Sequence, residues 1–130
     1  MKQIFLATII SVLFFSCSGN SGYDNKVESV QQHEQNNPKQ FLTLKADYKK
    51  NLAGKFILEG SISNAAKLTN YKDVEIAVTY FSKTKSKIED NKIIIYENVP
   101  SGGQTDFKQK LDTPEGTESL AFSLSGASVQ

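Results

Sequence analysis

The chain has almost none of the side chains that carry out covalent chemistry or bind metals. It contains one cysteine, Cys17, one histidine, His33, and no tryptophan or arginine. Both residues precede position 41, where strand-like patterning begins, so the later region lacks the side chains for Ser-His-Asp or Cys-His catalysis and for the usual zinc sites. His33 has no neighbouring cysteine or histidine to complete a metal site, and we interpret it as solvated. The sequence therefore predicts no catalytic residue, no metal ligand and no cofactor.

The absence of arginine also argues against nucleic-acid binding. All 15 basic residues are lysines, and they face 14 acidic residues. A nucleic-acid-binding protein normally has a basic surplus that includes arginine. Four lysines crowd one predicted hairpin: Lys83, Lys85, Lys87 and Lys92. Glu89 and Asp90 interrupt this run, so we interpret the lysines as a solvated face. The aspartates and glutamates of residues 41–126 are scattered along the sequence, and we interpret them as solvated too.

The N-terminus, in contrast, has a clear pattern. After Met1-Lys2-Gln3, an apolar run of 12 residues extends from Ile4 to Phe15. As a helix, such a run rises roughly 18 Å, whereas the hydrocarbon core of a bilayer is about 30 Å thick. The run is too short for a comfortable membrane span, so residues 1–16 are predicted to be a cleavable signal peptide.

The end of this segment, Leu13-Phe14-Phe15-Ser16-Cys17, resembles the lipobox of bacterial lipoproteins, although Phe14 and Phe15 are bulkier than the usual residues. The resemblance implies cleavage between Ser16 and Cys17 and acylation of Cys17, which would attach the chain to a lipid bilayer. A lone cysteine agrees with this, because an exported protein enters a disulfide-permissive compartment and Cys17 has no partner there. The neutral residues that follow Cys17 favour the periplasmic face of an outer membrane.

Residues 17–40 are predicted to form the lipidated cysteine and a flexible tether. From residue 18 to residue 40, two valines and one tyrosine are the only sizeable apolar groups. Such a segment buries too little apolar surface to offset the entropy lost on ordering. A short helix over residues 26–35 is the alternative. Because such a tether contributes nothing to a hydrophobic core, we expect the domain to fold without residues 18–38.

Residues 41–126 alternate between apolar and polar side chains, which predicts β-strands. Clusters of turn-forming residues, among them Asp90-Asn91, separate the stripes. The strands are predicted near residues 41–48, 56–63, 74–80, 92–97, 105–111 and 120–124, with a seventh near 86–88. This pattern is typical of an all-β fold, an antiparallel β-sandwich of about seven strands. A small barrel is the alternative, and residues 127–130 are predicted to be a tail.

Three segments of this region, residues 56–64, 71–81 and 99–107, resemble the FxLYD-type domains of secreted and lipid-anchored bacterial proteins. The similarity covers about residues 44–124. It implies an immunoglobulin-like or fibronectin-III-like sandwich with no catalytic residue. One departure follows the aromatic end of the third strand, where the family tends to have Asp and a Gly turn and this chain has Ser82-Lys83-Thr84-Lys85.

The alternation also predicts where a partner would dock. If the apolar stripe of residues 74–80 faces the core, Phe81 must point outward with Ala77 and Thr79. The run Ile93-Ile94-Ile95 leaves at least one isoleucine outside, whichever parity is buried. We interpret Phe81, Ile93 and Ile95 as candidate partner contacts. The alternatives are that a loop or the tether covers these side chains, or that they are isolated exposed residues.

Two classes of function remain for this chain. The lack of catalytic and metal-binding patterns favours a non-enzymatic binding or assembly module of the cell envelope. Its expected contacts are the bilayer, through acylated Cys17, and another envelope protein or a glycan. The alternative is an envelope enzyme with an unrecognised site.

Overall fold

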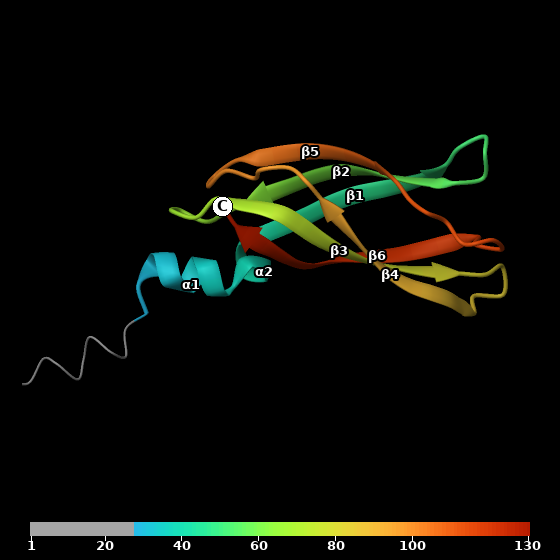
Figure 1. Ribbon diagram of the computed structural model, residues 1–130, viewed down its shortest axis with the longest axis horizontal. Coiled ribbons are helices and arrows are strands. Elements are labelled where there is room, and N and C mark those ends of the chain that lie inside the picture. Colours follow the sequence, from blue (N-terminus) through green and yellow to red (C-terminus); the bar gives the residue numbers. More distant parts are fainter. Residues whose placement is uncertain (1–27) are drawn as a thin grey trace, which may run out of the picture.

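The computed structural model describes residues 28–130, which form two short helices followed by six strands (Figure 1). The helices are α1 (Val30–Asn36) and α2 (Pro38–Phe41). The strands are β1 (Leu42–Lys50), β2 (Phe56–Asn64), β3 (Tyr71–Phe81), β4 (Lys87–Ile95), β5 (Gln104–Lys110) and β6 (Ser119–Val129).

The strands form two three-stranded antiparallel sheets, with the orders β1-β2-β5 and β4-β3-β6. The sheets lie face to face as two layers (Figure 1). The predicted all-β antiparallel sandwich is therefore confirmed, with six strands in place of about seven. The β1–β2 hairpin, the β3–β4 hairpin and the β5–β6 connection all lie at the end of the sandwich opposite α1 (Figure 1).

The difference in strand number arises in β4. The predicted seventh strand at residues 86–88 and the predicted turn at Asp90-Asn91 belong to one continuous strand, in which Asp90 pairs with Thr79 of β3. The Thr79 hydroxyl donates a hydrogen bond to the Asp90 carboxylate at 2.7 Å. Because β4 is at the edge of its sheet, its polar side chains stay in solvent, and turn-forming residue types are tolerated within the strand.

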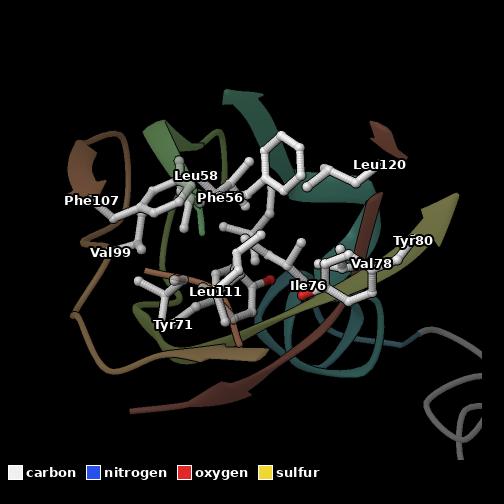
Figure 2. Packing of buried hydrophobic residues seen from close by; sticks show 14 of the residues in the cluster. Phe56, Leu58, Tyr71, Ile76, Val78, Tyr80, Val99, Phe107, Leu111 and Leu120 are labelled. Carbon is white, nitrogen blue, oxygen red and sulfur yellow. The ribbon is translucent and has the colours of Figure 1, made fainter. Parts of the chain in front are cut away.

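The core lies between the two sheets, where the apolar stripes meet (Figure 2). The predicted alternation is confirmed for β3, whose inward residues are all buried, and for most of β2. The buried apolar residues of these two strands are Phe56, Leu58, Ile62, Tyr71, Val74, Ile76, Val78 and Tyr80. β1 differs, because Leu42 is buried at its start while Tyr48 near its end is exposed. Its apolar stripe therefore leaves the core as the strand proceeds.

The last part of the predicted tether is helical and belongs to the folded unit. Helix α1 begins with a capping box, in which Gln32 N–H donates to the Ser29 hydroxyl at 3.1 Å and Ser29 N–H donates to the Gln32 side chain at 3.3 Å. A helix this short is marginal in isolation. Its place therefore depends on contacts with the sandwich.

Those contacts centre on Glu34, whose side chain is only 1% exposed. Its carboxylate accepts hydrogen bonds from three consecutive backbone N–H groups of the β2–β3 loop, at Lys67 (2.7 Å), Leu68 (3.0 Å) and Thr69 (2.9 Å). The Tyr71 hydroxyl donates to the backbone carbonyl of Glu34. The structure thus differs from the prediction of a tether up to residue 40, because a polar contact, which hydrophobic patterning does not register, orders this segment.

The C-terminal boundary also differs from the prediction. Residues 127–129, predicted to be part of a tail, extend β6 and place Val129 opposite Tyr71 of β3. The backbone N–H of Gln130 donates to the carbonyl of Asn70 at 3.0 Å. Backbone pairing with a central strand therefore orders residues whose side chains carry little apolar signal.

Two opposing effects act on the ionisation of Glu34. Burial alone raises the pKa of its carboxyl group, but the hydrogen bonds from residues 67–69 favour the charged form and outweigh it, so the pKa lies below its usual value. In the pH range between the two values, the unfolded chain binds more protons than the folded one. Stability therefore falls as the pH is lowered through this range.

We expect Glu34→Gln to lower the urea midpoint at pH 7 and to weaken the loss of stability below about pH 4.3, where an unperturbed Glu is protonated. The variant removes the charge that three backbone donors share. Urea titrations of protein produced from Ser18 onward, with amide exchange at residues 67–69, measure both effects. Glu97→Gln, at an exposed carboxylate, is the matched control. Equal midpoints for the two variants would contradict the role of Glu34.

Candidate functional site

The face of sheet β4-β3-β6 that points away from the core is the candidate site, and we term it the outer face. Ala77 and Thr79 of β3 lie on it, as predicted from the alternation. Phe81 follows in the same alternation and is half-buried. Cross-strand pairing places Ala121 and Ser123 of β6 beside Thr79 and Ala77. The centre of the outer face is therefore lined by small side chains.

The three isoleucines of β4 do not all lie where the prediction placed them. Ile95 is only 3% exposed and pairs with Val74, while Ile93 pairs with Ile76 and packs against the core. Ile94 is 40% exposed and pairs with Glu75 on the outer face. Neither Ile93 nor Ile95 therefore lies on the outer face, where their predicted partner contacts would have to be made. The alternation that buries Val74 and Ile76 also buries the residues opposite them.

Two hollows follow one another along the outer face. The first, the Asp90 hollow, has a volume of about 440 Å³. The second, the Tyr96 hollow, has a volume of about 390 Å³. The Asp90 hollow is lined by Ala77, Val78, Thr79, Asp90, Asn91 and Lys92. The Tyr96 hollow is lined by Asp73, Glu75, Ile94, Tyr96, Gly126, Ala127 and Ser128.

Ion pairs and hydrogen bonds hold the polar groups of the outer face in place. Lys92 Nζ lies 3.2 Å from Glu75 Oε1, and this pair joins the two hollows, because each residue lines a different one. Asp90 accepts hydrogen bonds from Lys87 and Thr79, which hold the pKa of its carboxyl group below its usual value. The Asp90 carboxylate is therefore charged at neutral pH.

Tyr96 and Asp73 are the members of the site that sequence reasoning missed. Tyr96 directly follows β4, on the same parity as Ile94, and is 78% exposed. Its place could have been found by continuing the alternation of β4 by one step. Asp73 has a φ of +48°, where the pairing of β3 with β6 is irregular between Lys72 and Glu75. No pattern in the sequence indicates this irregularity.

The remaining predicted site residues lie elsewhere. Ser16 and Cys17, the predicted cleavage and lipidation site, are outside the described residues. The His33 ring makes contacts within its own helical segment, at 3.3 Å to Glu28 and to Asn37, and lies edge-on to Phe41. Lys83 and Lys85 are exposed on the β3–β4 hairpin.

Within residues 28–130, no three His, Cys, Asp or Glu side chains gather closely enough to bind a metal ion. None of the helices described for this part of the chain combines the length and apolar character that crossing a membrane requires. No protein-family model, curated protein or solved structure matches the chain.

The two faces of β4 can be told apart by substitution. Ile95→Ala leaves a cavity in the core, so we expect it to lower the free energy of unfolding by about 2–5 kcal/mol. Ile94→Ala removes a partly exposed side chain, and we expect a loss of about 1 kcal/mol or less. Urea unfolding of both variants gives the comparison. A larger loss for Ile94→Ala would reverse the assignment of the two faces.

Proposed function

We propose that this protein is a lipid-anchored, non-enzymatic binding module of the bacterial cell envelope. Cleavage after Ser16 and acylation of Cys17 would hold it on a bilayer, at the periplasmic face of an outer membrane. The lipobox-like run Leu13 to Cys17 and the lack of a second cysteine support this attachment. The resemblance of residues 44–124 to FxLYD-type domains supports the same placement, since such domains occur in lipid-anchored proteins.

One observation carries the binding function: residues 30–41 pack at one end and one edge of the sandwich, and no segment among residues 28–130 covers the outer face. Glu34 holds α1 on the β2–β3 loop. Helix α2 lies beside residues 125–127 of β6. Neither helix lines the Asp90 hollow or the Tyr96 hollow. A domain held in this way presents the outer face to a partner, either another envelope protein or a glycan.

The attachment is tested by Cys17→Ser in a bacterium that processes lipoproteins. Because the thiol would be the acylation site, we expect this variant to incorporate no labelled palmitate and to change its mobility on electrophoresis. Ser18→Ala, which alters the neighbouring hydroxyl, should be labelled like the unaltered protein. Undiminished labelling of Cys17→Ser would contradict the proposed anchor.

The binding function is tested by photo-crosslinking in intact envelopes. A benzophenone amino acid in place of Thr79 reports on the outer face, and the same group in place of exposed Thr43 of β1 is the matched control. We expect an adduct of higher mass from position 79 and none from position 43, because Thr79 lines the Asp90 hollow and Thr43 lies on the other sheet. If position 79 gives no adduct, the outer face is not a binding surface in the envelope.

A further inference from the structure

We propose that the outer face binds a linear polysaccharide chain of pyranose sugars, with the ring of Tyr96 as a stacking platform and the polar groups around the two hollows as hydrogen-bond partners. This inference rests on the proposed binding function and specifies its ligand class. It follows from the shape, the floor and the charge of the outer face.

The shape suits a repeating ligand. At about 440 and 390 Å³, each hollow is near the lower end of the range of about 300–1,000 Å³ for small-molecule sites. The hollows are open and follow one another along β3, from Thr79 in the first to Asp73 in the second. Such a row suits a chain of small units better than one compact ligand.

The floor of the outer face allows a flat chain to approach the sheet closely. Ala77, Ala121 and Ser123 are small, and Gly126 carries no side chain where it lines the Tyr96 hollow. A Cβ atom at Gly126 would lie 3.7 Å from the Glu75 carboxylate. A larger side chain at this position would extend into the space beside Glu75.

The walls provide both kinds of contact that a sugar ring uses. A pyranose has an apolar face of C–H groups and a rim of hydroxyls, and the exposed ring of Tyr96 offers a flat apolar surface with a polar tip. Carboxylates of Asp73 and Glu75 accept hydrogen bonds, and the ammonium group of Lys92 donates them. Hydroxyl groups, which both donate and accept, can pair with either kind.

The charge of the outer face disfavours a polyanion. The two hollows are lined by three carboxylates, at Asp73, Glu75 and Asp90, and by the ammonium group of Lys92. Two ion pairs, Lys92–Glu75 and Lys87–Asp90, balance two of the three carboxylates. A nucleic acid or another densely charged polyanion would need a basic surplus. An uncharged or weakly charged polysaccharide has no such requirement.

The apolar groups of the outer face disfavour a protein partner. A protein interface is usually centred on large apolar or aromatic side chains that become buried together. Here the aromatic side chains, Phe81 and Tyr96, lie toward the ends of the face. Its centre is formed by Ala77, Thr79 and the Lys92–Glu75 ion pair, with Ile94 as the one large apolar side chain beside Glu75. This arrangement leaves a largely polar centre between two aromatic side chains.

The test uses the acylated protein in detergent micelles, titrated with cellohexaose and with chitohexaose and followed by NMR of the backbone amides. We expect at least one of the two sugars to shift amides of residues 73–79, 92–96 and 126–128. We expect Tyr96→Ala to weaken that binding by about tenfold or more, and Tyr96→Phe to stay within about twofold of the unaltered protein. Leu52→Ala, at an exposed residue of the β1–β2 hairpin, should not change it.

The inference is overturned if neither sugar shifts these amides at concentrations up to about 10 mM, or if the shifts lie elsewhere on the domain. Unchanged affinity in Tyr96→Ala also overturns it. Crosslinking at position 79 separates this failure from failure of the proposed function. A protein adduct there, without sugar binding, would retain the binding module and replace its ligand class.

Discussion

Each of the two sheets buries one of its faces against the other, and this apolar contact holds the domain together. The chain has no cysteine besides Cys17, so no disulfide cross-links residues 28–130, and apolar contact between the sheets has to stabilise them. β3 lies in the middle of its sheet and contributes Val74, Ile76, Val78 and Tyr80 to the core. Since alternate side chains of a strand point to opposite faces, the same burial determines which residues form the outer face.

A second, polar interaction extends the folded unit toward the N-terminus. The carboxylate of Glu34 is taken out of water, which is costly, and three backbone N–H groups of the β2–β3 loop compensate for the lost hydration. Among residues 28–130, Glu34 is the acceptor for all three of these backbone donors. Glu34 therefore stabilises the loop and α1 together. It also sets the direction from which the chain enters the sandwich.

The position of α1 and the openness of the outer face fit one arrangement of the proposed module. The chain enters at one end of the sandwich, and the hairpins lie at the other (Figure 1). The outer face extends between these ends along β3, with the Asp90 hollow nearer the hairpins and the Tyr96 hollow nearer the helices. A chain-like ligand on this face would lie along the long axis of an anchored domain, and both of its ends would remain accessible.

The apolar stripes of β2 and β3 and the sandwich class were predictable from the sequence, because alternation is a local property of a strand. Cleavage after Ser16 and lipidation of Cys17 remain predictions from sequence. The tertiary structure decided that Asp90-Asn91 continues β4, that Ile94 and not Ile95 faces outward, and that Tyr96 lies beside Asp73. It also decided the burial of Glu34, whose carboxylate accepts hydrogen bonds from residues 67–69, more than 30 positions later in the chain. These outcomes depend on pairing between distant segments, which no local pattern encodes.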